Sequence, residues 1–343
     1  MNPAAWAETL LNRHWWRPRR TALSLALQPL AWLYGWLAWM HRVASRPQRA
    51  PVPVIVVGNL VAGGAGKTPT VIALVQALLR CGRHPAVVSR GHGRSGTAPA
   101  MVQAGSQATE VGDEPWLIQR RTGVPVRVDR DRLAASRMLC RQHPEVDVLV
   151  LDDGLQHHAL IHDAAVVVFD ERGVGNGALL PAGPLRETMQ AAPPPHWRVL
   201  YTAGRRSARW PGAPATRQLQ HAWPLPAWHA GDASQCLPLH ALRGRPLLAV
   251  AGLGAPEKFF GMLEAAGLLI QRLPLPDHHP YDSLPWPGST LEVITTEKDA
   301  AKLAAARMGN TAVWVVPLDL LLPDGFAAEV LTLLNRSHPL SGP

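Results

Sequence analysis

The chain has 343 residues, of which 47% are apolar and 17% charged, so it can bury a sizeable core and is not disordered throughout. Lysines and arginines number 34 against 25 aspartates and glutamates, and the net charge of +9 permits a phosphate, anionic-lipid or nucleic-acid partner without selecting among them. The three cysteines, Cys81, Cys140 and Cys236, lie too far apart for a disulfide framework or a zinc site of the common spacings.

Residues 1–50 differ in composition from everything that follows. Residues 21–40 contain no charged side chain, and arginines bracket them on both sides. At about 1.5 Å per helical residue, this run could just cross a hydrocarbon layer of about 30 Å. Six of the 13 tryptophans also lie in this region: Trp6, Trp15, Trp16, Trp32, Trp36 and Trp39.

Four interpretations of this segment compete. A cleaved signal peptide would have a shorter apolar region, and Gln28, Pro29 and Gly35 weaken a transmembrane helix. An ordinary buried helix is the simplest alternative. An interfacial helix, with tryptophans among lipid headgroups and arginines on anionic lipid, uses every feature of the segment. We therefore expect an apolar helix that associates with a membrane surface.

From residue 54 the pattern becomes that of an α/β protein. Residues 54–57 are a continuous β-branched run, typical of a strand buried on both faces of a parallel sheet. Apolar spacing predicts a helix over 70–80, and further strands are predicted at 86–88, 146–151 and 166–169. This alternation favours a doubly wound parallel sheet like that of phosphate-loop NTPases.

Proline-, alanine- and arginine-rich stretches at 191–195 and 203–226 then suggest a connection between domains. A second α/β pattern follows, with strands predicted at 246–251, 291–295 and 312–316 and helices at 256–266 and 300–308. We therefore expect three parts. These are a membrane-associating segment over 1–50, a nucleotide-binding domain over 51–200, and a smaller C-terminal α/β domain over 201–343.

The strongest chemical signal is a glycine-rich loop between the first predicted strand and helix. Its glycines would let backbone N–H groups face phosphate oxygens, Lys67 would reach the β- and γ-phosphates, and the Thr68 hydroxyl would bind Mg²⁺. The strict pattern G-x-x-x-x-G-K-[ST] has glycine where this chain has Val61. The rest of the pattern is intact, so we assign ATP binding to Val61, Ala62, Gly63, Gly64, Ala65, Gly66, Lys67 and Thr68.

Two carboxylates, Asp152 and Asp153, follow the strand predicted at 146–151. The carboxyl ends of parallel strands meet at one edge of a sheet, where a nucleotide-binding sheet places the carboxylate that binds Mg²⁺. We expect the two residues to divide metal binding and orientation between them, in an order that the sequence does not give.

Histidines follow these carboxylates directly, at positions 157, 158 and 162. Their spacing matches no closed zinc site, so we expect them to position substrate or to form hydrogen bonds. Arg186 lies in a Gly-Pro-Leu-Arg-Glu segment and could recognise phosphate.

Two other polar clusters allow more than one interpretation. From the residues alone, Asp113 beside Glu114 is a helix N-cap. Asp277, His278 and His279 form a polar island that could hold a general-base dyad or be an ordinary surface loop.

Seven short motifs, in this order along the chain, resemble those of the tetraacyldisaccharide 4'-kinase family, kinases of lipid A synthesis. The resemblance extends from the N-terminal apolar segment to about residue 303. The motifs are Gly-Gly-Ala-Gly-Lys-Thr-Pro at 63–69, Ser-Arg-Gly-His-Gly-Arg at 89–94, Gly-Asp-Glu-Pro at 112–115, Asp-Asp-Gly-Leu-Gln-His at 152–157, Gly-Pro-Leu-Arg-Glu at 183–187, Asp-His-His-Pro-Tyr at 277–281 and Thr-Glu-Lys-Asp at 296–299.

The resemblance implies transfer of the ATP γ-phosphate to the 4'-hydroxyl of a tetraacylated glucosamine disaccharide 1-phosphate, which forms lipid IVA. It also implies ATP and Mg²⁺ as cofactors, and a location at the cytoplasmic face of the inner membrane of a Gram-negative bacterium. The four acyl chains of such an acceptor give a physical reason for a membrane-associating segment, since they would otherwise have to leave the bilayer.

The same resemblance implies roles for particular residues. Asp113 and His278 match a proposed dyad that activates the acceptor hydroxyl, so Asp113 changes from a cap to a catalytic residue. Lys67 and Thr68 match the phosphate-loop pair, and Asp152 and Asp153 match the Mg²⁺ and nucleotide carboxylates. Residues near the site would be Gln156, His157, Arg186 and Glu187. The chain departs from the family at Val61, Ala65 and His92.

The nucleotide motifs alone leave two other classes open. One is an NTPase whose hydrolysis drives a protein partner, and the other is a nucleic-acid-binding ATPase. The N-terminal apolar segment argues against both, as does the lack of a basic stripe with interleaved aromatic residues beyond residue 50. We therefore expect no nucleic-acid partner, and the sequence does not predict an oligomeric state.

Overall fold

A mixed sheet of eight strands forms the centre of the first unit, in the order β3-β4-β2-β5-β1-β6-β7-β8. The computed structural model describes residues 11–337. All neighbouring strands pair in parallel except β3, which runs antiparallel to β4 near one edge. The strands are β1 (Val54–Gly58), β2 (Pro85–Ser89), β3 (Ala100–Met101), β4 (Val126–Val128), β5 (Val148–Asp152), β6 (Ala164–Phe169), β7 (Trp197–Tyr201) and β8 (Ala213–Pro214).

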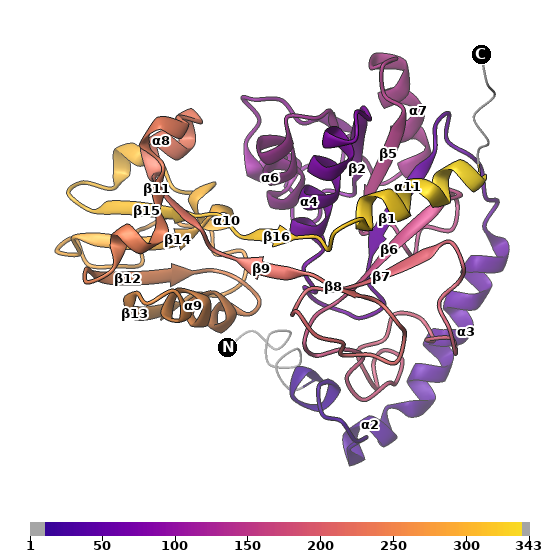
Figure 1. Ribbon diagram of the computed structural model, residues 1–343. Helices are drawn as coiled ribbons and strands as arrows, with labels where there is room; N and C mark the ends of the chain where they lie inside the picture. Colours follow the sequence, from indigo (N-terminus) through magenta and orange to yellow (C-terminus); the bar gives the residue numbers. More distant parts are fainter. Residues whose placement is uncertain (1–10, 338–343) are drawn as a thin grey trace.

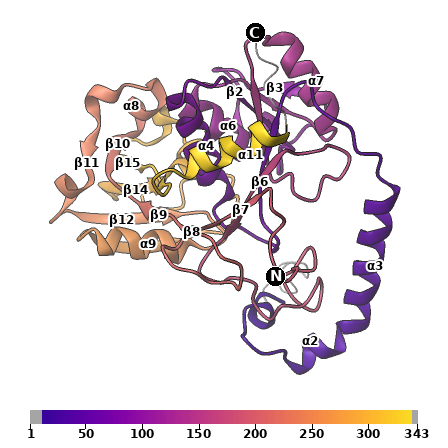
Figure 2. The same cartoon turned by 45° about the vertical axis from the view of Figure 1, so that its right-hand side comes forward.

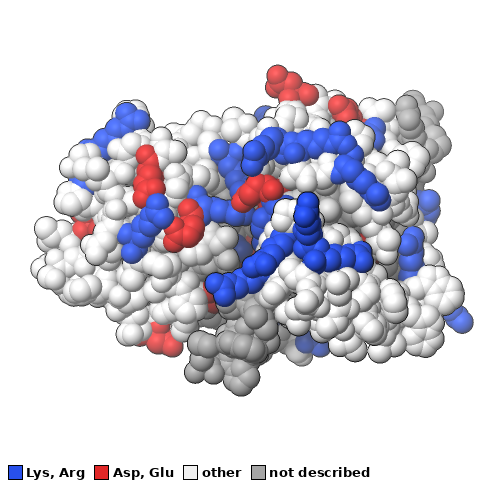
Figure 3. Space-filling model, turned by 90° about the horizontal axis from the view of Figure 1, so that it is seen from below, with Lys and Arg blue, Asp and Glu red and all other residues white. Residues whose placement is uncertain are grey.

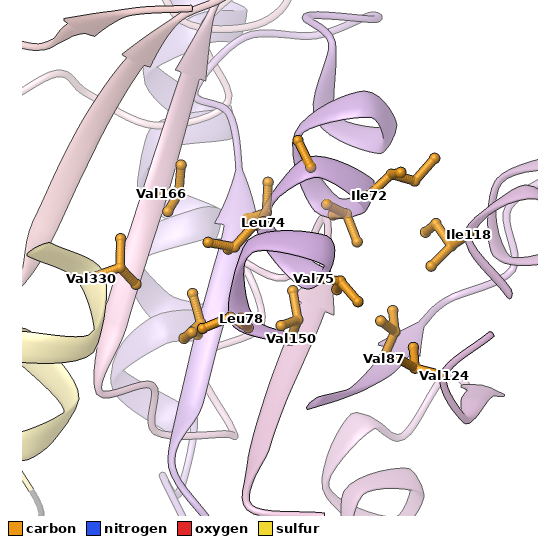
Figure 4. Close-up of a cluster of buried hydrophobic side chains, with 14 of the residues drawn as sticks. Ile72, Leu74, Val75, Leu78, Val87, Ile118, Val124, Val150, Val166 and Val330 are labelled. Carbon is orange, nitrogen blue, oxygen red and sulfur yellow. The ribbon is translucent and has the colours of Figure 1, made fainter. Parts of the chain in front are cut away.

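Helices cover both faces of this sheet, as a doubly wound fold requires. Alternate residues of β1 enter different cores, with Ile55 and Val57 on one face and Val54 and Val56 on the other. The first face packs against α4 (Lys67–Arg80), α6 (Asp113–Thr122) and α11 (Phe326–Ser337), and the second against α7 (Arg132–Gln142). The first core includes Ile72, Leu74, Val75, Leu78, Val87, Ile118, Val124, Val150, Val166 and Val330 (Figure 4).

A second, smaller unit is built on a six-stranded sheet in the order β11-β10-β15-β14-β12-β13 (Figure 1). Strands β12, β13, β14 and β15 pair in parallel, with β13 at one edge, and β10 and β11 add an antiparallel pair at the other edge. Its strands are β10 (His221–Pro224), β11 (Leu237–Pro238), β12 (Pro246–Ala251), β13 (Leu269–Pro274), β14 (Glu292–Thr296) and β15 (Ala312–Val316). Its helices are α8 (Leu225–Ala230), α9 (Pro256–Ala265) and α10 (Glu297–Ala300), and α5 (Ala108–Val111) precedes α6 in the first unit.

The chain passes between the two units twice. The outgoing strand β9 (Thr216–Gln218) and the returning strand β16 (Asp319–Leu321) form a two-stranded antiparallel ribbon between the sheets (Figure 1). Beyond β16, α11 packs on the first sheet, where Val330 and Leu334 join its core. Two elements of the 201–343 segment, β8 and α11, therefore pack with the first unit.

The N-terminal apolar run forms two helices, α2 (Ala22–Ala26) and α3 (Gln28–Ala44), separated at Leu27. No helix within the described residues is long and apolar enough to span a membrane. Figures 1 and 2 place α3 along the first unit, on the side away from the second unit. Trp6, one of the tryptophans expected among lipid headgroups, lies outside the described residues.

Most predicted elements of the two α/β patterns are present within a few residues of their expected bounds. One is wrong: the helix expected over 300–308 ends at Ala300, and only a 3₁₀ turn, Ala305–Arg307, follows it. The buried side chains of Ala300, Leu303 and Met308 produced the helical spacing, but they pack from short turns rather than from one helix face.

Candidate active site

The glycine-rich loop begins where β1 ends and finishes at the first turn of α4. A Cβ atom on Gly58 would stand 2.7 Å from the Cβ of Leu155, so only glycine fits the end of the strand. Gly63 and Gly66 have φ of 87° and 90°, a region that side chains other than glycine rarely adopt. β1 lies between β5 and β6, so the loop opens at the centre of the carboxyl edge of the sheet.

Val61, which replaces the first glycine of the strict pattern, is fully buried. It pairs with Leu185 in an antiparallel bridge, and the N–H of Ala62 donates to the carbonyl of Pro184 at 2.7 Å. Val61 is not among the described residues with positive φ. The backbone at this position therefore does not require glycine, and the departure from the pattern leaves the loop intact.

Lys67 lies between the loop and the carboxylate of Asp153. Its Nζ is 3.4 Å from Oδ1 of Asn59 and 3.5 Å from Oδ2 of Asp153. The Asp153 carboxylate also accepts from Nη1 of Arg186 at 3.1 Å. Burial favours a higher pKa for Asp153, but Lys67 and Arg186 outweigh it and hold the pKa below its usual range.

Asp152 has a different environment, although it adjoins Asp153. It is buried, and in the described part of the chain no basic side chain forms an ion pair with it. The Ser89 hydroxyl donates to it at 3.2 Å. Burial, together with the charges of Asp153 and Glu114, raises the pKa of Asp152 to about 6. The two neighbouring carboxylates are thus chemically distinct.

The near-site residues form one hydrogen-bonded group. Nε2 of Gln156 donates to Glu187 at 2.8 Å and to the carbonyl of Asn59 at 3.2 Å, and Arg186 donates to Oε1 of Gln156 at 3.3 Å. The hydroxyl of Tyr34, in α3, donates to the Arg186 carbonyl at 3.0 Å. The N-terminal helix is therefore attached directly to the segment that surrounds the loop.

Asp113 and His278 come from different units and are in contact. Nδ1 of His278 is 3.0 Å from Oδ2 of Asp113, and Nζ of Lys302 lies at 3.0 Å from the same oxygen. The helix-cap interpretation of Asp113 is wrong, because Gly112 is the N-cap residue and Asp113 is the first residue of α6. The Asp113 carboxylate instead contacts His278 and Lys302 of the second unit.

This contact shifts both pKa values. The hydrogen bond to Asp113 raises the pKa of His278, although partial burial opposes the shift. Burial favours a higher pKa for Asp113, but hydrogen bonds from His278 and Lys302 outweigh it and lower the pKa. Asp113 therefore remains a carboxylate, and a protonated imidazole is stabilised beside it.

Two of the histidines after Asp153, His157 and His162, are partly buried away from solvent. Burial lowers the pKa of His157 and of His162 to about 4, and Nε2 of each is buried without a hydrogen-bond partner. Both rings are therefore neutral at physiological pH.

The sequence analysis assigned a role to Lys67 but to none of the other three lysines, Lys258, Lys298 and Lys302. Lysine is rare in this chain, and each of its four lysines forms an ion pair with an acidic side chain. Lys67 contacts Asp153, Lys302 contacts Asp113, Lys298 contacts Glu114 at 2.5 Å, and Lys258 contacts Asp170 at 3.0 Å. The scarcity of lysine among 34 basic residues was the signal that could have identified them.

A glycine-rich loop between a parallel strand and a helix, with carboxylates at the end of the next strand, defines a phosphate-loop nucleotide-binding protein. Comparison with known proteins identifies the group. The family model described as tetraacyldisaccharide-1-P 4'-kinase (LpxK) matches residues 23–335. The chain belongs to this family.

Individual relatives agree with this assignment. The chain is 52% identical to the tetraacyldisaccharide 4'-kinase of Leptothrix cholodnii, over 93% of this chain and 94% of that protein. It is 48% identical to the enzyme of the same name from Methylibium petroleiphilum, over 97% and 95%. The fold is similar to that of LpxK from Aquifex aeolicus in a crystal structure with ATP, with a TM-score of 0.73 and 26% identity over 92% of this chain and 99% of that one.

Proposed function

We infer that this protein is an ATP-dependent kinase that phosphorylates the 4'-hydroxyl of a tetraacylated disaccharide 1-phosphate to form lipid IVA. Its family membership supports the reaction and the substrate class. The observation that carries the inference in the structure is the pairing of Asp113 with His278. This pair adds a proton acceptor to a phosphate loop, as a kinase needs and a simple nucleotide-binding module does not.

The phosphate loop and Lys67 would stabilise the charge of the transferring phosphoryl group. Backbone N–H groups of the loop would face the phosphates, and Lys67 would supply a positive point charge to their β- and γ-oxygens. Asp153 and Asn59 orient the Lys67 side chain before the nucleotide binds. Arg186 neutralises Asp153, so that the local charge remains favourable to an anion.

His278 would take the proton from the acceptor hydroxyl. With its Nδ1–H donated to Asp113, the neutral imidazole presents Nε2 as a proton acceptor. Asp113 would then stabilise the imidazolium that forms, while Lys302 keeps Asp113 ionised. In this arrangement Asp113 orients the base and does not itself become protonated.

The donor set around Asp152 fits a magnesium ion. Mg²⁺ prefers oxygen ligands and usually combines one or two protein oxygens with phosphate and water. The Thr68 hydroxyl and the Asp152 carboxylate are such oxygens, whereas Asp153 is engaged by Lys67 and Arg186. In the described residues no group of three or more His, Cys, Asp and Glu side chains could hold a metal. We propose that Thr68 and Asp152 bind the ion, which would offset phosphate charge, and that Asp153 orients them.

The N-terminal helices would place the site at a membrane surface. Trp32, Trp36 and Trp39 on α3 are exposed, at 67%, 54% and 59%, together with neighbouring leucines. Lys and Arg side chains extend across the face seen in Figure 3, where anionic lipid could be bound. We propose peripheral attachment at the cytoplasmic face of the inner membrane, where the acylated acceptor lies.

Acceptor-dependent ATP turnover tests the proposed function. The purified protein is incubated with Mg²⁺-ATP in detergent micelles, with and without the tetraacylated disaccharide 1-phosphate. We expect ADP formation to require the acceptor and to match the amount of phosphorylated lipid. Equal turnover with water alone would indicate an NTPase that serves another partner.

A further inference from the structure

Arg172, which follows β6, contacts the phosphate loop from the side. Its Nη2 donates to the carbonyl of Gly64 at 2.5 Å. Its Nη1 lies 3.9 Å from where a Cβ on Gly63 would stand. The arginine thus binds a backbone carbonyl of the loop and leaves the loop N–H groups free for phosphate.

The same guanidinium is fixed by a fully buried carboxylate. Nη2 and Nε of Arg172 are 2.7 and 2.8 Å from Oδ2 of Asp170, whose side chain has no exposed surface. Burial alone would raise the pKa of Asp170, but Arg172 and Lys258 outweigh it and lower the pKa, so Asp170 is ionised. A planar guanidinium can bind a carboxylate and a carbonyl together in fixed geometry, which an ammonium group cannot.

Asp170 also connects the loop to the second unit. Lys258, in the first turn of α9, lies 3.0 Å from Oδ2 of Asp170 and 2.6 Å from Oε1 of Glu171. Arg172 of the first unit and Lys258 of the second unit therefore share one buried oxygen, Oδ2 of Asp170. On the N-terminal side, the ring of Trp16 covers the Arg172 guanidinium at 4.2 Å.

Glycine-rich loops need such support because glycine loses more conformational freedom than any other residue when it is ordered. Gly63, Gly64 and Gly66 supply the close approach to phosphate, and they also make the empty loop costly to order. A hydrogen bond from a fixed arginine to the Gly64 carbonyl removes part of that freedom before the nucleotide arrives.

We propose that Arg172 is a positioning residue that preorganises the phosphate loop for ATP. The shared contact of Arg172 and Lys258 with Asp170 couples this preorganisation to the C-terminal unit. The inference rests on the proposed function only in taking ATP as the ligand. Loss of either basic side chain should weaken ATP binding and leave acceptor recognition unchanged.

ATP affinity, measured by calorimetric titration without acceptor, tests the proposal in a double-mutant cycle. We expect Arg172→Gln to raise the Kd for ATP about tenfold, the order of one hydrogen bond to a charged group. Lys258→Met, which acts on the loop through Asp170 and not by direct contact, should raise it about threefold. The double variant should resemble Arg172→Gln rather than reach the product of about thirtyfold, because both changes break one coupled contact.

Matched variants separate positioning from general charge and from folding. Arg209→Gln removes an arginine whose partners among residues 11–337 are the carbonyls of Met189 and Gln190, and it should leave the Kd for ATP unchanged. Arg172→Lys keeps the positive charge but loses the planar guanidinium that binds the carboxylate and the carbonyl together, so it should still bind ATP about fivefold more weakly than wild type. Thermal unfolding of each variant shows whether it is folded. If Arg172→Gln does not fold, the Kd for ATP of Arg172→Lys is compared with that of the wild type instead.

Three results would overturn the proposal. These are an Arg172→Gln Kd within twofold of wild type, full rescue by Arg172→Lys, or a double variant at the product of the single effects. The KM for the acceptor should stay within about twofold in every variant. Failure here would leave acceptor-dependent turnover by the wild type untouched, so the two proposals are tested separately.

Discussion

Replacing Asp113 with asparagine would remove one charge and keep the shape of the side chain. The amide oxygen can still accept from Nδ1 of His278, so the imidazole keeps its orientation. What is lost is the negative charge that raises the pKa of His278. If neutral His278 accepts the hydroxyl proton, kcat rises with pH as the imidazolium loses its proton.

The size of the shift follows from the charges in contact. Two unit charges about 4 Å apart interact by about 1 kcal/mol in bulk water and by about 4 kcal/mol at an effective dielectric constant of about 20. The His278 side chain is 41% exposed, and Lys302 already shares the Asp113 carboxylate, so the lower figure applies. One pKa unit corresponds to about 1.4 kcal/mol. We therefore expect the kinetic pKa of Asp113→Asn to fall by about half a unit to one unit.

The sign of the effect is fixed by the structure. In the wild type the rise in kcat should be centred above the ordinary histidine value of about 6.5, because Asp113 raises the pKa of His278. In Asp113→Asn it should move to lower pH, and in His278→Ala it should disappear with a loss of about 10²–10⁴ in kcat. The assay is kcat against pH from 5 to 9, on the order of one reading per half unit, at saturating ATP and acceptor. An unchanged midpoint in Asp113→Asn would refute the coupling, and a persistent rise in His278→Ala would refute His278 as the base.

Three further changes test other parts of the account. Lys67→Ala should reduce kcat/KM more than about tenfold, because the β- and γ-phosphates lose their point charge; a steady-state assay that retains over a tenth of wild-type activity would contradict the phosphate-loop assignment. Val61→Gly should restore the strict pattern yet lower stability by about 1.5–3 kcal/mol in urea unfolding, because Val61 is buried, and it should not tighten ATP binding. Replacing Trp32 and Trp36 with serine should weaken binding to anionic vesicles about tenfold, measured by sedimentation of the protein with the vesicles, without changing ATP affinity. Leu291→Ser, which changes an exposed leucine of the second unit, should leave vesicle binding unchanged.

The central strand and the loop could be predicted because local sequence determines them. The β-branched run of β1 is buried on both faces of the sheet, as its continuous apolar pattern indicates. By contrast, β13 was not predicted. It is an edge strand whose residues are mostly exposed, so its side chains, which include Gln271 and Arg272, carry no apolar alternation.

The composition of the active site depended on contacts that no local pattern encodes. Asp113 and His278 lie in different units, 165 positions apart, and spacing could not indicate their contact. The family resemblance suggested the pair. The ionic group of Asp170, Arg172 and Lys258 was missed altogether, because an aspartate at the end of a strand is common and its partners lie in another turn and another unit.

The chemical position of the transferred phosphate tests the central claim most directly. The protein is supplied with γ-labelled Mg²⁺-ATP and the tetraacylated disaccharide 1-phosphate, and the purified lipid is analysed by mass spectrometry and by phosphorus–proton correlation NMR. The account predicts a second phosphate monoester, correlated with the proton at carbon 4', and no such product from the Lys67→Ala variant. Label recovered only as inorganic phosphate, or on another hydroxyl of the sugar, would contradict it.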